Sequence, residues 1–510
     1  MPNASFEELS FPDSSSYTMR FAQGAFWSLI ATMGTRLFTF AANIFVARVL
    51  GKEGFGELAI ILSTVAMLGT FSGLGIGMTA TKYVAELRLQ DPERAGRIIG
   101  LTYLVSWIAG GLMAMFCLLA APWLAMRTLN APHLIPELQI ASLEVLISTG
   151  FAPQVGILSG LQAFRALARI NWYQGLLSLP INVVLVLVAG LRGVIVALIL
   201  VTAIEALLSV MYLRKECLSN KVRPDFRRAW QERAILWRFS LPAFLTNTIN
   251  TPVIWAAYAI LANQPNGYAE LGLFNAASQF NLLITGLNTI LATVSVPLLA
   301  EVYGKEQRER FALFFNTNFR FNWGLCIAFG FVAVIISPWL IRFFGVGYQG
   351  ALPILQLNIS FMIVYVGCAL TGQAFYSSGK MWLALLVTVF WATVLLSCET
   401  FIAPLYGALG LSISMLIAYC LVFVGQIALL MYLFGSSVAK DIHILSLLYF
   451  ILMLHVILSV GSYNNILINF FIYLAFLITG YNFFKRNLDL FQKILQALRA
   501  FWANGRFSNA

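Results

Sequence analysis

Long apolar stretches recur along this chain of 510 residues, from Phe21 to Phe484. Each stretch is about 20 residues long, which is the length of α-helix that crosses ~30 Å of membrane hydrocarbon. Hydrophobic residues make up 60% of the sequence and charged residues 10%, against roughly 25% charged in soluble domains, so a water-soluble fold is excluded. The stretches do not alternate polar and apolar residues, as the strands of a transmembrane β-barrel would. The sequence therefore predicts an all-α, polytopic membrane protein.

Fourteen membrane spans are predicted, organised as two six-helix bundles and two accessory helices. The spans lie near residues 21–45, 58–80, 98–121, 138–160, 173–190, 193–213, 240–262, 272–300, 321–342, 353–376, 383–403, 408–434, 444–461 and 464–484. The corresponding domains are a disordered cytoplasmic N-terminal tail (1–20), a first bundle (21–213), a basic cytoplasmic linker (214–239), a second bundle (240–434), the accessory helices (435–484) and a basic cytoplasmic C-terminal tail (485–510).

The Lys and Arg residues lie mostly on one side of the predicted membrane. With the N-terminus in the cytoplasm, the inside segments hold 26 of them and the outside loops hold 5. Lys and Arg favour cytoplasmic loops, so both termini are expected in the cytoplasm of a cell whose inner (plasma) membrane holds the protein. The net charge of +11 is explained by this topology, and no separate folded module points to nucleic acid.

Cysteine and histidine show no pattern typical of disulfides, metal ions or cofactors. The six cysteines fall mostly inside spans and form no CxxC pair. His133, His443 and His455 have no carboxylate or thiol at ligand spacing. No metal and no cofactor are therefore expected.

An internal repeat is visible in five landmarks that recur in the same order and at a nearly constant offset along the sequence. They pair Trp27-Ser28-Leu29 with Phe239-Ser240-Leu241, Gly56 with Gly272, Val84-Ala85-Glu86 with Leu299-Ala300-Glu301, Gln162-Ala163-Phe164 with Gln373-Ala374-Phe375, and Gly193 with Gly407. A repeat of six helices enters the membrane from the same side in both copies, so a pseudo-two-fold axis runs along the membrane normal. Facing bundles with a cavity between them are expected.

Polar side chains recur at three- and four-residue spacing in the first, seventh and eighth spans, which places them on one face of each helix. Placing these polar side chains against lipid would cost free energy, because hydrocarbon offers no hydrogen-bonding partners. The polar stripes that they form along the helices therefore predict the wall of a substrate cavity. The alternative is that they only form hydrogen bonds between helices, worth ~0.6 kcal/mol each on average. The candidate cavity residues are Arg36, Thr32, Thr39, Asn43, Asn247, Asn250, Tyr258, Asn275, Gln279 and Thr285.

Charged residues inside the spans are few, and each costs ~2.5 to 3.5 kcal/mol at a helix centre. Arg36 lies near mid-membrane, where either an anionic ligand group or an ion pair with a Glu would compensate its charge. Glu205 is also mid-span and is the best candidate for a group that takes up a proton. Glu144 and Glu399 lie nearer the outside ends of their spans and are further candidates for proton or ion coupling.

Several local motifs resemble the polysaccharide transporters of the multidrug/oligosaccharidyl-lipid/polysaccharide flippase superfamily. They are Ala47-Arg48-Val49-Leu50-Gly51-Lys52-Glu53-Gly54-Phe55-Gly56, Ser72-Gly73-Leu74-Gly75, Lys82-Tyr83-Val84-Ala85-Glu86, Gly272-Leu273-Phe274-Asn275-Ala276-Ala277 with Pro297, and Tyr406-Gly407-Ala408-Leu409-Gly410. The resemblance covers residues 21 to about 434. It implies alternating-access flipping of undecaprenyl-pyrophosphate-linked oligosaccharide units to the outer leaflet, for O-antigen, capsule or exopolysaccharide assembly.

The resemblance also implies the partners: the lipid-linked oligosaccharide, membrane lipids, and the polysaccharide polymerase and chain-length machinery. The accessory helices resemble those of lipid II flippases, which leaves a prenyl-tail groove and a lipid-facing scaffold as alternatives. The rival function is a cation-coupled multidrug exporter of the same superfamily, although the first-helix aspartate of such exporters is absent. An enzyme is not expected, because the longest outside loop, 121–137, carries only two charges, Arg127 and Glu137.

Overall fold

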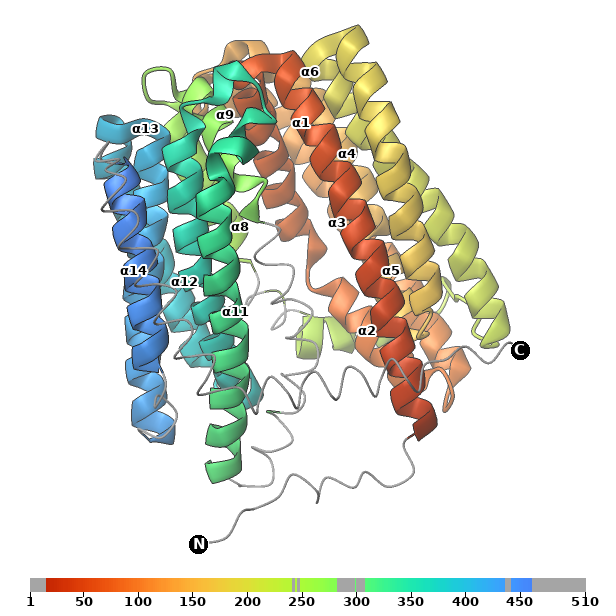
Figure 1. Cartoon of the computed structure of the whole chain (residues 1–510). Helices are drawn as coiled ribbons and strands as arrows, with labels where there is room; N and C mark the ends of the chain where they lie inside the picture. The colour runs from red at the N-terminus through yellow and green to blue at the C-terminus, as the bar shows by residue number, and fades with distance from the viewer. Residues whose placement is uncertain are drawn as a thin grey trace, which may run out of the picture. The chain divides into compact units, whose positions relative to one another are not determined.

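The computed structural model describes residues 15–240, 244, 248–281, 299, 308–435 and 442–460. These residues form helices joined by short connections, and none of them lies in a strand (Figure 1). Seven helices of the described part are long and apolar enough to cross a membrane. The predicted all-α membrane fold is therefore confirmed, while the number of fourteen spans stays a prediction.

Three helices are much longer than a membrane is thick: α1 (Ser15–Gly73), α6 (Phe164–Ser219) and α13 (Met381–Phe434). Each contains one glycine with non-helical dihedrals: Gly51 (φ 71°, ψ 177°) in α1, Gly190 (φ 57°, ψ −131°) in α6 and Gly407 (φ 53°, ψ −130°) in α13. Glycine has no Cβ and therefore tolerates this left-handed region. Each long helix thus consists of two arms that correspond to two consecutive predicted spans.

The arms of α6 fold back on each other. Gln174 and Glu205 are 31 residues apart on this helix, which would separate them by about 46 Å if α6 were straight. Instead, the side-chain amide of Gln174 donates a hydrogen bond of 2.6 Å to Glu205 Oε2. The turn at Gly190 therefore produces an antiparallel hairpin of two spans.

The remaining helices are shorter. They are α2 (Ile76–Leu87), α3 (Pro92–Trp123), α4 (Ile135–Phe151), α5 (Pro153–Gly160), α8 (Asn250–Ala262), α9 (Gly267–Ser278), α11 (Arg308–Arg342), α12 (Ala351–Ser377) and α14 (Ile442–Val460), with single turns at Leu124–Thr128, Pro132–Leu134, Ala229–Glu232, Leu236–Ser240 and Val346–Tyr348. The predicted second span is interrupted at Leu74 and Gly75, which both have positive φ. Helix α6 extends to Ser219, so the first residues of the predicted linker are helical.

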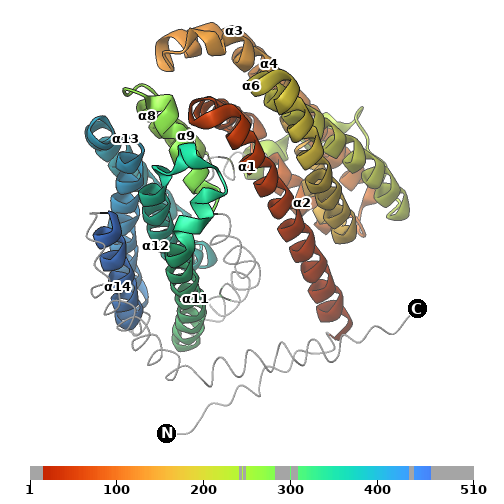
Figure 2. The ribbon, with the colours of Figure 1, turned by 45° about the horizontal axis from the view of Figure 1, so that its top comes forward.

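The chain divides into two compact units. The first comprises residues 1–279, 342–349 and 388–414, and the second comprises residues 280–341, 350–387 and 415–510. In the first unit α1 packs against α3, α4, α6, α8 and α9, and α2 packs against α5. Figures 1 and 2 both show α8 beside α9. The division into the domains named above stays a prediction.

An aromatic cluster organises the second unit. Trp323 on α11 is 1% exposed, and its indole N–H donates to the carbonyl of Ile363 on α12 at 2.9 Å. The Trp323 ring lies 5.1 Å from the ring of Phe423 and stacks on Tyr449 of α14 at 6.4 Å. Helix α14, the first predicted accessory helix, therefore packs against this unit. The second, near 464–484, lies outside the described residues.

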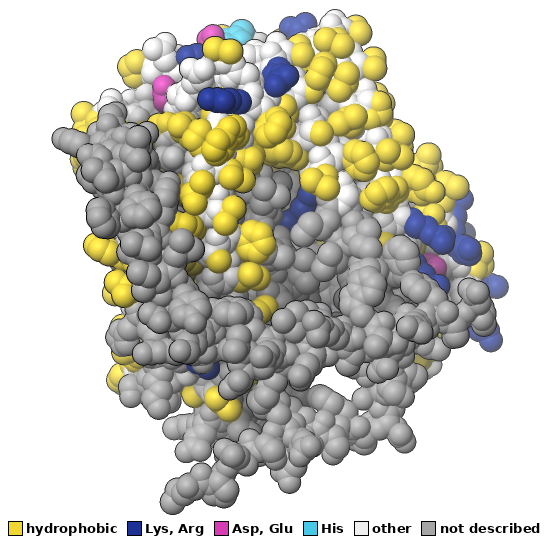
Figure 3. All heavy atoms as spheres, viewed as in Figure 1, with side chains coloured by type: hydrophobic (Ala, Val, Ile, Leu, Met, Phe, Trp, Pro, Cys, Tyr) yellow, Lys and Arg dark blue, Asp and Glu magenta, His cyan; other side chains and the backbone are white. Residues whose placement is uncertain are grey.

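The outer surface of the helices is strongly apolar. Leu112 is 67% exposed, Val188 77% and Leu405 75%. Figure 3 shows hydrophobic side chains over much of the visible described surface. Soluble monomers rarely expose large continuous apolar areas. These side chains are therefore the surface that lipid covers.

Reciprocal contacts in the first unit support the predicted repeat. A Cβ added to Gly56 on α1 would lie 1.8 Å from the carbonyl oxygen of Tyr268, and one added to Gly272 on α9 would lie 1.7 Å from that of Lys52. Gly272 follows Gly56 in the sequence at the same offset at which Tyr268 follows Lys52. The two copies of one local structure therefore meet through the same surface, as in a two-fold contact.

A second reciprocal pair lies next to these glycines. Arg48 Nε donates to the carbonyl of Phe343 at 2.8 Å, and Asn263 Nδ2 donates to the carbonyl of Thr128 at 2.7 Å. The offset from Arg48 to Asn263 in the sequence equals the offset from Thr128 to Phe343. In each half, a polar side chain thus donates a hydrogen bond to a backbone carbonyl just after the third span of the other half.

Candidate functional site

Three predicted cavity residues, Asn43, Asn275 and Gln279, form a hydrogen-bonded group that we name the amide cluster. Asn43 Nδ2 on α1 donates to Gln279 Oε1 at 2.9 Å, and Gln279 Nε2 donates to Asn275 Oδ1 on α9 at 3.3 Å. All three side chains are half-buried. Amides both donate and accept hydrogen bonds, so the amide cluster can exchange these internal bonds for bonds to a hydroxyl-rich ligand.

The stripe on α1 serves two purposes. Arg36 and Thr39 are half-buried and precede Asn43 by seven and four residues, so they share its helical face. Thr35 belongs instead to helix packing, because its hydroxyl donates to the carbonyl of Asn171 on α6 at 2.6 Å. Thr32 lies in α1, but its side chain is outside the described part of the chain.

The other candidate cavity residues are partly described. The Tyr258 ring on α8 meets Phe274 on α9 edge to face, with ring centroids 5.7 Å apart, and Asn250 at the start of α8 is exposed. Asn247 and Thr285 lie outside the described residues. Trp255 on α8 was not singled out from the sequence. Its indole N–H donates to Thr64 Oγ1 on α1 at 2.9 Å, as expected of a partly buried indole, which needs an acceptor.

Two of the three predicted coupling residues lie together. Glu144 on α4 is 5% exposed, and its Oε1 accepts a hydrogen bond of 2.9 Å from Thr202 on α6. Glu144 Oε2 has no hydrogen-bond partner among the described residues. Glu205, one turn beyond Thr202, interacts electrostatically with Glu144. We name Glu144 and Glu205 the carboxylate pair. Two carboxylates repel each other in apolar surroundings, and a role of this pair in proton or ion coupling stays a prediction.

The acid Glu137, near the carboxylate pair, forms an ion pair with an arginine. Glu137 lies seven residues before Glu144 on α4, and Arg192 Nε on α6 donates to Glu137 Oε1 at 2.8 Å. Arg192 closely follows the turn at Gly190, so the hairpin positions this arginine. The ion pair closes one end of the polar seam between α4 and α6, and the carboxylate pair lies further along the same seam.

Glu399 lies elsewhere, on the first arm of α13, and is fully buried. Ser414 on the second arm faces its carboxyl group, although neither Glu399 oxygen makes a well-formed hydrogen bond among the described residues. Another acid, Glu270 on α9, was not singled out from the sequence. Glu270 Oε2 accepts the backbone N–H of Ala408 at 3.0 Å and so caps the second arm of α13 at Gly407.

Residues 21–303 match the family model described as polysaccharide biosynthesis protein. The chain belongs to this family. The membership confirms the resemblance drawn from the local motifs. It also fits the amide cluster, because amide side chains are suited to sugar hydroxyls.

Two similar proteins align with most of the chain. The EPS I polysaccharide export inner membrane protein EpsE of Ralstonia nicotianae is 26% identical over 424 residues, which is 80% of this chain and 93% of the relative. The protein of the same name from Ralstonia solanacearum is 23% identical over 413 residues, which is 78% of this chain and 91% of the relative.

Solved structures with the same fold are transporters. An inward-facing multidrug resistance MATE family transporter of the MOP superfamily matches with a TM-score of 0.68 and 16% identity, covering 81% of this chain and 98% of that one. A MOP superfamily transporter from Pyrococcus furiosus matches with a TM-score of 0.61 and 16% identity, covering 82% and 96%. At this identity the likeness shows the fold alone.

Proposed function

We propose that this protein is a flippase that moves undecaprenyl-pyrophosphate-linked oligosaccharide units from the cytoplasmic to the outer leaflet of the inner membrane. The units serve cell-surface polysaccharide synthesis, as O-antigen, capsule or exopolysaccharide. The amide cluster carries the proposal: hydrogen-bonding groups are held between apolar helices in a member of a polysaccharide biosynthesis family. The names of the EpsE relatives, which are polysaccharide export proteins, support the same conclusion.

The chemistry of the cargo matches these groups. A sugar head rich in hydroxyls cannot cross ~30 Å of hydrocarbon without hydrogen-bonding partners. Asn43, Asn275 and Gln279 offer such partners at modest strength, which allows release. Arg36 lies on the same face of α1 as Asn43 and is suited to the anionic pyrophosphate, which an arginine binds by charge-assisted hydrogen bonds. The prenyl tail stays in the lipid.

Two energy sources are compatible with this reaction. Moving two negative charges out of a cell whose interior is negative is favourable by about 4.6 kcal/mol at 100 mV, at ~2.3 kcal/mol per charge. The carboxylate pair Glu144 and Glu205 offers a second source, since a site that binds a cation or proton in one state and releases it in the other couples an ion gradient to transport. Glu399 is a further candidate for this coupling.

The distribution of Lys and Arg supports cytoplasmic termini, and the cargo would enter the protein from the cytoplasmic side. The product appears at the outer leaflet, where polysaccharide polymerase and chain-length machinery would receive it. We propose these proteins as partners and propose no enzymatic activity for the chain itself.

The alternative is a cation-coupled multidrug exporter. The carboxylate pair favours this function, because carboxylates bind organic cations as well as protons, and the solved structures of this fold include multidrug transporters. The amide cluster favours the flippase. The two functions differ in the charge of the cargo, which makes them separable by experiment.

The test is transport by the purified protein in liposomes loaded with a fluorescent lipid-linked oligosaccharide, followed by an enzyme or quencher that reaches only one leaflet. Asn43→Ala and Gln279→Ala should each slow flipping. Asn182→Ala is the matched control, because Asn182 is a half-buried amide on α6 that, among the described residues, donates to its own helix, to the Ser178 carbonyl at 2.7 Å. Transport of a cationic dye without any flipping would replace the flippase with the exporter.

A further inference from the structure

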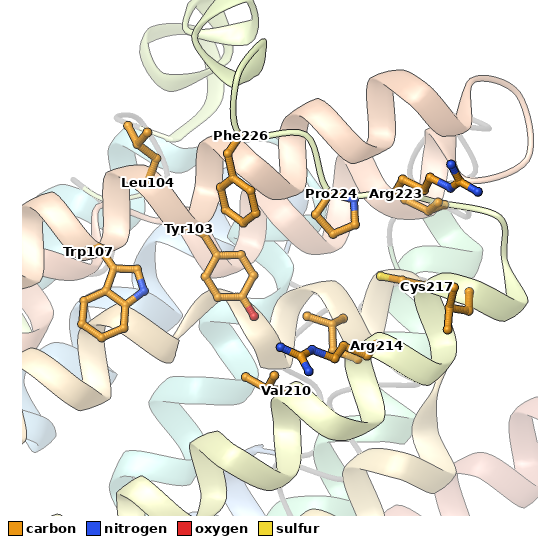
Figure 4. A pocket seen from close by; sticks show the side chains of 12 residues that line it. Tyr103, Leu104, Trp107, Val210, Arg214, Cys217, Arg223, Pro224 and Phe226 are labelled. Atoms are coloured by element: carbon orange, nitrogen blue, oxygen red, sulfur yellow. The ribbon is translucent and has the colours of Figure 1, made fainter.

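A groove of about 630 Å³ opens on the first unit, outside the amide cluster and the carboxylate pair. It lies between α3, the last turns of α6 and the segment that follows α6 (Figure 4). Tyr103 and Trp107 come from α3, Leu213 and Arg214 from α6, and Phe226 from the segment. Its volume is typical of sites for small molecules.

The lining of this groove is apolar and open. Trp107 is 40% exposed, Phe226 is 55% exposed, and Leu218 beside them is 75% exposed. The rings of Tyr103 and Phe226 lie 6.3 Å apart, so they form a continuous aromatic wall. Surfaces of this kind bind aliphatic chains, because burial removes apolar area from water.

Positive charge borders the apolar lining. Arg214 and Arg223 both line the groove, and Lys215 and Lys221 are exposed close to them in the chain. The nearby acids are Glu216 and Asp225, so the four basic residues outnumber them; Asp225 Oδ1 also accepts the backbone N–H groups of Arg227 and Arg228. Figure 3 shows Lys and Arg gathered where α6 ends, at the right of the view. An occupant with an aliphatic chain and a negatively charged head complements this arrangement.

The groove is held in a fixed shape. The backbone N–H of Asp225 donates to the Gly96 carbonyl at 3.0 Å, and a Cβ on Gly96 would lie 2.0 Å from the Arg223 carbonyl oxygen. Further along the segment, Glu232 accepts from Arg94 and Arg97 of α3 at 3.2 Å each. A glycine contact and two ion pairs thus anchor the segment against α3, so little ordering is needed when a ligand binds.

We propose that this groove binds one acyl chain of an anionic phospholipid of the cytoplasmic leaflet, with Arg214, which points toward Tyr103, on the lipid phosphate and Arg223 adding positive charge at the border of the groove (Figure 4). The placement in that leaflet rests on the predicted topology, since the end of α6 belongs to the most basic predicted cytoplasmic segment. Anionic phospholipids surround the protein at high local concentration, so mass action favours them over scarcer anionic lipids. Occupancy of the groove, and therefore the packing of the segment that follows α6, would then depend on the fraction of anionic lipid in the membrane.

The test uses the full-length protein purified in detergent and native mass spectrometry with added phosphatidylglycerol or phosphatidylcholine of identical acyl chains. Phosphatidylglycerol should be retained preferentially. Two arginines near a phosphate correspond to a roughly thirtyfold change in affinity, so Arg214→Gln with Arg223→Gln should reduce retention by about that factor. The matched control is Arg165→Gln with Arg169→Gln, which removes two exposed arginines from the beginning of α6 outside the groove.

A second measurement does not depend on any variant. Phosphatidylglycerol carrying a photoreactive acyl chain, irradiated with the unmodified protein in liposomes, should label α3 and the end of α6 near Trp107 and Leu218. Equal retention of both lipids, an equal loss in the control variant, or labelling only elsewhere would overturn the proposal. Displacement of phosphatidylglycerol by an equal amount of undecaprenyl phosphate would also overturn it, since the groove would then belong to the cargo. None of these results depends on whether the protein flips oligosaccharides.

Discussion

The reciprocal glycine contact makes a quantitative prediction for stability. In Gly56→Ala the new Cβ would lie 1.8 Å from the Tyr268 carbonyl oxygen, whereas carbon and oxygen normally approach to about 3.3 Å. Helices α1 and α9 must then separate by about 1.5 Å, the difference between these two distances. Overpacking costs about 1–3 kcal/mol, and the upper value applies because the obstacle is backbone rather than a flexible side chain.

The change from Gly to Ala also favours the helix itself by roughly 0.5–1 kcal/mol, so the net loss in the free energy of unfolding should be about 2 kcal/mol. Gly69 on the same helix has no atom within 4 Å of an added Cβ. Gly69→Ala therefore isolates the gain in helix propensity and should leave stability unchanged or slightly increased. Gly272→Ala should match Gly56→Ala, since its Cβ would lie 1.7 Å from the Lys52 carbonyl oxygen.

The assay is reversible unfolding of the purified variants in one detergent, with expression and monodispersity recorded for each. The double variant Gly56→Ala with Gly272→Ala should lose less than the sum of the single losses, because one separation of α1 from α9 relieves both clashes. If Gly56→Ala unfolds at the same denaturant concentration as Gly69→Ala, the close approach of the two helices is wrong.

Three further predictions concern the turn in α13 and the proposed transport. Gly407→Ala should destabilise the protein by about 1–2 kcal/mol more than Gly190→Ala in thermal unfolding. Both variants strain the backbone, but of these two positions only Gly407 would place the new Cβ against another side chain, 2.7 Å from Glu270 Oε2. Equal losses of stability in the two variants would refute this. Arg36→Ala should abolish surface polysaccharide at normal expression while Arg36→Lys retains part of it, and full activity of the alanine variant would remove Arg36 from the substrate site. Glu205→Gln should abolish any dependence of flipping on a pH gradient in liposomes, and an unchanged dependence would exclude a coupling role.

Hydropathy and spacing were sufficient to predict the fold class. Backbone polar groups must be hydrogen-bonded inside the lipid, so long apolar stretches form helices. The turn at Gly190 coincides with the end of a predicted span, and the turn at Gly407 falls between two predicted spans. The extension of α6 to Ser219 was not predicted, because basic residues are compatible with a helix as well as with a loop. The break at Leu74 was missed although Gly73 and Gly75 flank it, because glycine also occurs frequently inside membrane helices and does not by itself mark a turn.

The candidate site was predictable only in part. Periodicity places Thr35 and Asn43 on one polar stripe, yet Thr35 bonds to α6 while Asn43 bonds to Gln279, which directly follows α9. A helical period defines a face but not which neighbour covers it. Glu270 was overlooked for the same reason, since its role as a cap arises from α13, far away in the sequence. Tertiary neighbours therefore decide which polar residues remain available to a ligand.

The reciprocity of the glycine contact bears on how such a chain can originate. Each half supplies both the flat helical surface and the carbonyl oxygen that lies against the opposite one. Two separate copies of a half-length polypeptide would meet through the same atoms and form a homodimer. Gene duplication and fusion would then preserve an interface that already existed. Afterwards Gly56 and Gly272 would evolve independently, although each would still have to lack a Cβ for the two helices to approach closely.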